Sequence, residues 1–417
     1  MFMSGFKKPA KQSDLVVGID FGTTKICVVI GKMTTEGVEI VGIGKQASLG
    51  IRKGIVVNIP STVEALKKAI DVAELMAGVE ITEAQCGIAG SHIKGFNSTG
   101  VVAIKNKEVG IQDVERAIDA AKAIAIPTDR EVLHVIPQEF TVNDHEGVKD
   151  PIGMSGVRLE SRVHVVTGDV ASAHNIIKCV NQAGIEVSDI VLEPLASAEA
   201  VLTLDEKELG VALIDIGGGT SDIAIYVRGS VVFTGVVPMG GNHITNDIAV
   251  GLRTSIQDAE RIKVTSGCAM ASLLANEEII EVPMMGGRKS KEISRSVLTK
   301  IIEPRVEEIL SMVGHEISNS GFKHLMSTGV VITGGASLLE GLPELAEFIL
   351  EMPVRRGAPQ GVGGLLDVVN SPMYSTAVGL LMYGKPSSSE MVFKIKDEDN
   401  VYGKVITRMK TWLGDVF

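Results

Sequence analysis

The sequence predicts an α/β protein of two halves that face each other across a cleft, with an inserted α+β subdomain and a C-terminal amphipathic helix. A sequence motif that occurs twice, about 195 residues apart, predicts the two halves. It consists of a strand, an acidic residue, a glycine turn, a hydroxyl residue and a second strand, and it covers residues 15–30 and 211–227. An irregular stretch between the two copies of the motif predicts the insert, and the apolar pattern of the last residues predicts the helix.

The two glycine turns have the composition of anion-binding loops. Glycine lets several backbone N–H groups approach a polyphosphate, and hydroxyl and ammonium groups add donors. The first turn offers Gly22, Thr23, Thr24 and Lys25, and the second offers Gly217, Gly218, Gly219 and Thr220. Asp20 and Asp215 end the strands before these turns, and two facing carboxylates suit a hydrated Mg²⁺ ion. The pair predicts a cleft that binds a nucleotide with Mg²⁺; two ordinary hairpin turns are the alternative.

A third glycine turn follows the short strand that begins at Gly329. Gly334 and Gly335 expose backbone that could lie against an adenine or a ribose, and a helix is expected to start at Ser337. A plain turn between a strand and a helix would have the same composition.

In this order, the three elements resemble the actin/Hsp70/sugar-kinase ATPase superfamily. The resemblance implies an actin-like ATPase fold around a nucleotide cleft, with ATP and Mg²⁺ as cofactors and with Gly334, Gly335 and Ser337 on the adenosine side. The stretch that begins with Glu193 and Pro194 is similar to the motif in which the superfamily places the residue that orients the attacking water. Glu260 and Lys263 are similar to the helical pair that contacts ribose and adenine, although an ordinary solvated helix face would look alike.

Length and composition exclude several classes of protein. At 417 residues the chain is too long for one core, and 45% hydrophobic residues with 22% charged residues are typical of a folded globular protein. A net charge of −11 argues against nucleic acid as a partner. The four cysteines show no metal or disulfide spacing, so we expect reduced thiols. No apolar run suggests a signal peptide or a membrane-spanning helix.

The elements between the motifs can be read in order. Residues 12–83 alternate strands with one helix, for which Ser61 or Thr62 is the expected N-cap. Apolar residues spaced for one buried stripe predict a helix over 111–124. A strand over 131–136 is expected to end at Pro137, and a helix–strand unit over 172–192 returns to the main fold.

Residues 244–328 are helix-rich and contain a dense basic cluster. The cluster comprises Arg288, Lys289, Lys291 and Arg295. It could dock an acidic peptide, or it could be the solvated entry of a helix.

The segment 401–417 reads as an interfacial amphipathic helix. At 100° per residue, nine apolar side chains fall within an arc of about 160° and every charged side chain falls outside it. The residues expected at the membrane are Val405, Arg408, Met409, Trp412, Leu413, Val416 and Phe417. A helix packed on the body of the protein is the alternative, but the polar stretch 385–400 before it reads as a flexible linker.

Within the superfamily, the insert and the tail resemble the FtsA family, the bacterial actin homologues that tie the FtsZ ring to the inner membrane. The most specific stretches are Val132–Phe140 and Pro151–Glu160 in the insert, and Tyr374–Leu381 near the C-terminal end. The resemblance implies subdomain 1A at 12–83, 164–196 and 372–384, inserted subdomain 1C at 84–163, subdomain 2A at 197–243 and 329–371, and subdomain 2B at 244–328.

The resemblance also implies partners and a location. Subdomain 2B would bind the C-terminal peptide of FtsZ, with Arg305 and Arg295 as contacts, and protomers would join head to tail into filaments. Anionic lipids of the inner membrane would hold the tail, and the insert would recruit later divisome proteins. The protein would then lie on the cytoplasmic face of the inner membrane, at the division septum.

The family is one of ATP-binding polymers with at most weak ATPase activity. A cell-shape filament of the same superfamily is the second hypothesis, and a sugar kinase is the third. A sugar kinase would carry an aspartate base at a sugar pocket, and no such residue stands out beyond the two loop aspartates.

Overall fold

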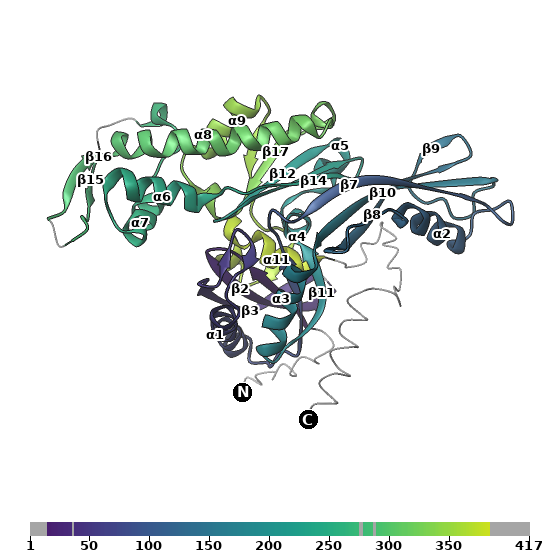
Figure 1. Ribbon diagram of the computed structural model, residues 1–417, viewed down its shortest axis with the longest axis horizontal. Coiled ribbons are helices and arrows are strands. Elements are labelled where there is room, and N and C mark those ends of the chain that lie inside the picture. Colours follow the sequence, from purple (N-terminus) through teal and green to yellow (C-terminus); the bar gives the residue numbers. More distant parts are fainter. Residues whose placement is uncertain (1–14, 36, 275–277, 287–288, 384–417) are drawn as a thin grey trace, which may run out of the picture.

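The computed structural model describes residues 15–35, 37–274, 278–286 and 289–383. The predicted linker at 385–400 and the predicted membrane helix at 401–417 lie outside the described residues. Figure 1 shows an elongated molecule, in which a long sheet extends to one side of the body and a β-hairpin to the opposite side.

The first half is built on a six-stranded sheet in the order β11-β6-β1-β2-β3-β19. Its strands are β1 (Leu15–Phe21), β2 (Lys25–Thr34), β3 (Gly37–Ala47), β6 (Glu83–Ile88), β11 (Glu186–Leu192) and β19 (Val362–Gly364). β1 pairs antiparallel with β2 across the first glycine turn and parallel with β6. The middle of β2 is fully buried, which explains its unbroken run of apolar residues.

Helices cover the first sheet. α1 (Ile59–Ala77) packs on β3, and α3 (Val170–Gln182) packs beside α1. The expected caps of α1 are wrong, because Asn58 accepts from the backbone N–H of Ser61 at 3.0 Å and the helix begins at Ile59. Pro60 lies in the first turn, where its missing N–H costs nothing, so the helix can start earlier than its apolar stripe suggests.

The second half repeats this plan in a five-stranded sheet with the order β14-β13-β12-β17-β18. Its strands are β12 (Val211–Ile216), β13 (Ser221–Val227), β14 (Ser230–Val237), β17 (Val330–Thr333) and β18 (Val354–Arg356). β12 pairs antiparallel with β13 across the second glycine turn and parallel with β17. The two predicted hairpins therefore occupy equivalent places in two similar sheets.

Helices and one hairpin complete the second half. They are α5 (Leu204–Leu209), α6 (Gly241–Leu252), α7 (Ile256–Ser266), α8 (Arg295–Asn319), α9 (Leu342–Leu350), β15 (Ile279–Val282) and β16 (Lys291–Ser294). The expected helix start at Ser337 is wrong, because residues Gly335–Leu338 form a 3-10 turn. α9 begins only after Gly341, which adopts φ +74°.

The insert is a four-stranded antiparallel sheet with one helix. Its strands are β7 (Lys94–Ala103), β8 (Arg130–Val142), β9 (His145–Val148) and β10 (Arg158–Asp169), in the order β7-β10-β8-β9. α2 (Ile111–Lys122) buries Val114, Ala117, Ile118 and Ala121 against the sheet, whereas Ile111 is 57% exposed. Because β6 pairs in the six-stranded sheet, the separate sheet starts later than the boundary expected at residue 84.

Pro137 does not end its strand, contrary to expectation. β8 continues to Val142, and Pro137 pairs with Val163 where the register with β10 shifts. A bulge at this place tolerates the missing N–H, because a ladder hydrogen bond is interrupted there anyway.

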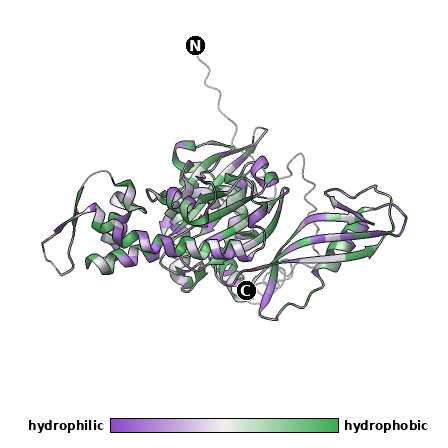
Figure 2. Cartoon of the chain, turned by 90° about the horizontal axis from the view of Figure 1, so that it is seen from above, coloured by the Kyte–Doolittle hydropathy of each residue, from purple (hydrophilic) through white to green (hydrophobic). Residues whose placement is uncertain are grey.

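Short helices join the two halves at the centre. α4 (Glu193–Val201) packs closely on α11 (Ser375–Met382), and α11 also contacts β1. Smaller elements are α10 (Leu366–Val369) and the strands β4 (Ile51–Arg52) and β5 (Ile55–Val56). Figure 2 shows that hydrophobic residues concentrate in the central strands. Within the described part of the chain, no helix is both long enough and apolar enough to cross a membrane.

Candidate functional site

The two predicted glycine loops meet at the junction of the two halves. A Cβ placed on Gly218 would lie 2.1 Å from Thr24 Oγ1, and one placed on Gly219 would lie 2.6 Å from Thr23 Oγ1. Gly218 and Gly219 thus each face a first-loop threonine so closely that an added Cβ would force a shift. The fold brings together the glycines and hydroxyl residues that the repeat predicted.

The two predicted aspartates lie under these loops, at the ends of β1 and β12. Asp20 and Asp215 are only 5% and 8% exposed. Asp215 Oδ2 accepts from Ser197 Oγ at 2.6 Å and from Thr376 Oγ1 at 3.1 Å. Burial raises the pKa of both carboxyl groups, and Lys25 beside Asp20 and the hydroxyl of Ser197 beside Asp215 counter part of the rise.

Asp222 is a further acidic residue at this place, and the sequence reading did not include it. It pairs with Asp215 across the β12–β13 hairpin, in the position that Cys27 takes opposite Asp20 in the first hairpin. Asp222 Oδ2 accepts from Thr220 Oγ1 at 2.8 Å, while the buried Oδ1 has no hydrogen-bond partner among the described residues. Burial and then the charge of Asp215 raise its pKa to about 7. A carboxylate at the start of an otherwise apolar strand was the signal in the sequence.

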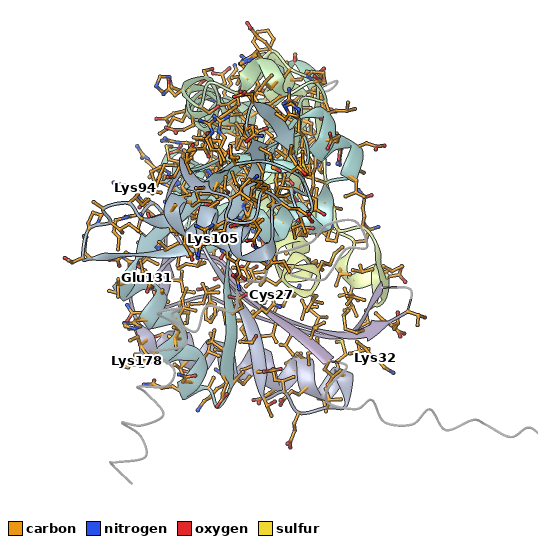
Figure 3. The ribbon with its side chains drawn as sticks, turned by 90° about the vertical axis from the view of Figure 1, so that its right-hand side faces the viewer. Cys27, Lys32, Lys94, Lys105, Glu131 and Lys178 are labelled. Atoms are coloured by element: carbon orange, nitrogen blue, oxygen red, sulfur yellow. The ribbon has the colours of Figure 1, made fainter. Side chains whose placement is uncertain are left out.

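Figure 3 locates the hairpin of the first half within the molecule. Cys27 lies near the centre, whereas Lys32, at the other end of β2, lies at the periphery. The end of β2 next to the first glycine turn therefore points toward the second half.

Glu193 joins the same acidic group at the first residue of α4. A Cβ on Gly87 would lie 3.2 Å from Glu193 Oε1, which places this carboxylate beside β6. Burial raises the pKa of Glu193 well above its usual value, and the charges of Asp20, Asp222 and Asp215 add to the rise. The expected water-positioning residue thus lies within electrostatic reach of both loops.

Lys25 is the half-buried cation of this group. Its Nζ donates to the carbonyl of Met373 at 2.7 Å and lies 3.4 Å from Asp20 Oδ2. Burial alone would lower the pKa of Lys25, but Asp20 and other nearby anionic groups raise it overall. Four acidic side chains, Asp20, Asp215, Asp222 and Glu193, therefore lie near this one lysine.

The chemistry of these donors fits a hydrated divalent cation. Mg²⁺ keeps several waters and binds through one or two carboxylates and substrate phosphates. Among the described residues, no three histidine, cysteine or acidic side chains are arranged to hold a metal directly. Asp20, Asp215 and the unpartnered oxygen of Asp222 could hold such an ion through water.

The third glycine turn lies beside the second loop. Gly334 adopts φ +86°, and a Cβ on it would lie 2.3 Å from Asp215 Oδ1, so both conformation and space require glycine. Gly335 is open, because its nearest neighbour would be Met373 Cβ at 3.8 Å. The buried Ser337 hydroxyl donates to the Gly334 carbonyl at 2.7 Å and so holds the turn.

Glu260 and Lys263 converge on the same corner from α7. Lys263 Nζ lies 2.7 Å from Glu260 Oε2 and donates to Thr245 Oγ1 at 2.9 Å. It also donates to the carbonyl of Gly241, the first residue of α6, at 3.1 Å. A Cβ on Gly241 would lie 3.2 Å from Ala336 Cβ, so the α7 pair and the third glycine turn face the start of the same helix.

The predicted peptide contacts lie on α8, away from this corner. Arg295, the first residue of α8, pairs with Glu278 and Glu340. Arg305 pairs with Asp247 on α6 and with Glu308. Both guanidinium groups therefore already have carboxylate partners within the chain. The predicted membrane residues, Val405 to Phe417, lie outside the described residues.

Comparison with known proteins gives two family matches. Residues 212–379 match the family described as cell division protein FtsA, and residues 90–167 match the SHS2 domain inserted in FtsA. The cell division protein FtsA of Pseudomonas aeruginosa is 50% identical over 405 residues, which cover 96% of this chain and 97% of that protein. The Escherichia coli K12 protein of the same name is 41% identical over 417 residues, which cover 98% and 99%.

Solved structures share the fold at much lower identity. A PilM-PilN type IV pilus biogenesis complex has a TM-score of 0.64 at 15% identity, covering 88% of this chain and 97% of that chain. The crystal structure of MreB5 of Spiroplasma citri bound to ADP has a TM-score of 0.54 at 14% identity, covering 88% and 95%. These likenesses show the expected actin-like ATPase fold and, at such identities, nothing further.

Proposed function

The chain belongs to the FtsA family of cell division proteins, and on that premise we propose that it binds ATP and Mg²⁺ where its two glycine loops meet and tethers the FtsZ ring to the inner membrane. The observation that supports nucleotide binding is the contact between Gly218 and Thr24 and between Gly219 and Thr23. Loops from two halves that approach this closely can hold one polyphosphate from both sides.

The residues divide into three roles. Backbone N–H groups of the glycine loops, with the hydroxyls of Thr23 and Thr24, bind the phosphates, and Lys25 adds positive charge. Asp20 and Asp215 hold Mg²⁺ through water. The open backbone at Gly335 and the Glu260–Lys263 pair bind the adenosine, while Ser337 supports that turn.

Hydrolysis, where it occurs, depends on Glu193. Mg²⁺ supplies charge neutralisation of the phosphates. Glu193 is held near both loop aspartates, and burial raises its pKa well above the usual value, so its carboxylate is a stronger base than an exposed one. It would orient and deprotonate a water, and we expect at most weak ATPase activity.

The remaining parts of the proposal concern partners. The subdomain boundaries given above would place the FtsZ C-terminal peptide on 2B, with Arg305 and Arg295 as contacts, and later divisome proteins on the insert. Residues 401–417 would bind anionic lipids on the cytoplasmic face of the inner membrane at the septum. Protomers would join head to tail, so that many weak anchors act together.

The test is a nucleotide-binding titration with a matched glycine control. Gly218→Ala puts a methyl group 2.1 Å from Thr24 Oγ1, whereas a Cβ on Gly363, in the edge strand β19, has its nearest neighbour at 4.0 Å. We expect Gly218→Ala to lower the affinity for Mg²⁺-ATP and Gly363→Ala to leave it unchanged, with both variants folded by circular dichroism. Equal ATP affinity in both variants would refute the proposed site.

A further inference from the structure

A small hairpin carries an unassigned lysine to the meeting point of the glycine loops. β4 and β5 are two residues each, and Lys53 and Gly54 form the turn between them. Their φ angles are +49° and +75°, the combination of a type I′ turn. The positive φ of Lys53 is thus explained by the turn, and its position is fixed by backbone geometry.

Contacts on three sides hold this turn in place. The N–H of Gly54 donates to Thr23 Oγ1 in the first loop at 3.1 Å. A Cβ on Gly219, in the second loop, would lie 3.0 Å from Lys53 Cα. A Cβ on Gly90, at the root of the insert, would lie 3.2 Å from the Lys53 carbonyl oxygen. The backbone of Lys53 therefore packs against both halves at once.

The charge of Lys53 is available to a ligand. Lys53 is exposed, and it forms no ion pair with any described residue. Lys25, by contrast, is already engaged with Asp20 and Met373. A triphosphate entering a site rich in carboxylates needs a further cation, and a lysine on a flexible four-carbon stem can move to meet it.

The direction of the second loop indicates which phosphate Lys53 would meet. Gly217 accepts from the N–H of Gly241, at the corner formed by Lys263 and the third glycine turn. Gly219, two residues later, faces Thr23 and Lys53. A nucleotide whose adenosine lay at the first corner would extend along the loop toward Lys53 with its last phosphate.

We propose that Lys53 binds the terminal phosphate of the nucleoside triphosphate and so makes the site prefer a triphosphate to a diphosphate. The inference rests on the proposed nucleotide site. It assigns to the β4–β5 turn a function beyond connecting β3 to α1.

The experiment compares ATP and ADP affinities, each with Mg²⁺, for the full chain and its variants by calorimetric titration. Lys53→Asn removes the charge and creates the Asn-Gly pair that type I′ turns prefer, so the hairpin should form normally. Lys107→Asn is the matched control, because Lys107 is also exposed and also has a positive φ, +60°, but lies in the insert.

We expect Lys53→Asn to weaken ATP binding about tenfold, the loss of one charge-assisted hydrogen bond, and ADP binding less than about twofold. Lys53→Arg should restore most of the ATP affinity, and Lys107→Asn should change neither. An unchanged ratio of ATP to ADP affinity in Lys53→Asn, or equal losses of both, would overturn this inference alone. Absence of ATP binding by the unaltered protein would overturn the proposed function and this inference together.

Discussion

Protonation of a buried histidine should loosen the contact between the insert and the second half. His164 on β10 is 1% exposed and lies between Asn97 on β7 and Thr234 on β14. Asn97 Oδ1 already accepts from Gln138 Nε2 at 2.9 Å, so His164 Nδ1 donates to it, at 2.8 Å. His164 Nε2 then accepts from Thr234 Oγ1 at 2.9 Å, and a second proton would remove this acceptor.

Linkage gives the sign and size of the effect. Burial lowers the pKa of His164 from 6.5 to about 4. Between these values the unfolded chain binds the proton more strongly than the folded chain. The contribution of neutral His164 to the free energy of unfolding is therefore complete above pH 6.5 and is lost as the pH falls through about 4. The full loss is about 3 kcal/mol, of which about 1 kcal/mol should disappear between pH 7.5 and 5.5.

The carboxyl groups of the site change the free energy of unfolding with pH in the opposite direction. A variant is therefore needed to isolate the effect of His164. Asp222, with a pKa raised to about 7, stabilises the fold as the pH falls. His164→Gln keeps one donor and one acceptor without a titrating group, and His174→Gln changes an exposed histidine as a control.

The assay is urea unfolding followed by circular dichroism at both pH values. We expect the free energy of unfolding of His164→Gln to gain about 1 kcal/mol relative to the unaltered protein on going from pH 7.5 to 5.5. The His174→Gln control should show no such gain. The same pH dependence in the unaltered protein and His164→Gln would refute the reasoning.

Three further predictions follow from other parts of the chain. Arg305→Glu should weaken binding of the FtsZ C-terminal peptide about tenfold in a fluorescence titration. Asp247→Asn, which removes one of the two carboxylate partners of Arg305, should not weaken it, and equal losses would indicate a structural effect. Trp412→Glu should abolish pelleting with anionic liposomes and leave ATP binding intact; retained pelleting would show that the segment 401–417 is not the membrane anchor. Gly44→Ala, whose Cβ would lie 1.8 Å from the Ala69 carbonyl oxygen of α1, should lower the free energy of unfolding by about 1–3 kcal/mol or more in urea, and a neutral effect would contradict the packing.

The repeat in the sequence singled out many, but not all, of the residues that the structure brings together at the two glycine loops. The same short motif occurs twice, which is why Asp20, Asp215 and the loop glycines stood out. In the structure both copies lie at equivalent positions in the two sheets. Asp222 and Lys53 follow no repeat: the first hairpin has Cys27 where the second has Asp222, and Lys53 belongs to a separate turn. A residue whose position matters only because the other half of the protein packs against it is not marked by any pattern in the sequence around it.

Helix and strand ends show the same limit. The apolar stripe located α1 and α2, but Asn58 rather than Ser61 or Thr62 caps α1, and β8 continues through Pro137. The apolar stripe of a helix indicates which residues face the core. The N-cap, in contrast, depends on backbone conformation outside that stripe. Whether a strand tolerates a proline depends on how it pairs with its neighbour. Here the register shift between β8 and β10 accommodates Pro137.

The sequence by itself determined the two-half plan and the two glycine hairpins, because glycine positions and apolar periodicity act over a few residues. It indicated the family through the resemblance of several longer stretches to FtsA. Tertiary structure alone decided that Gly218 meets Thr24, that Lys53 lies against Gly219, and that β14 is joined to the insert through His164. Each of these contacts links residues far apart in the chain. Their geometry depends on how two sheets and an insert pack together, and periodicity indicates only that a face is buried, not which surface covers it.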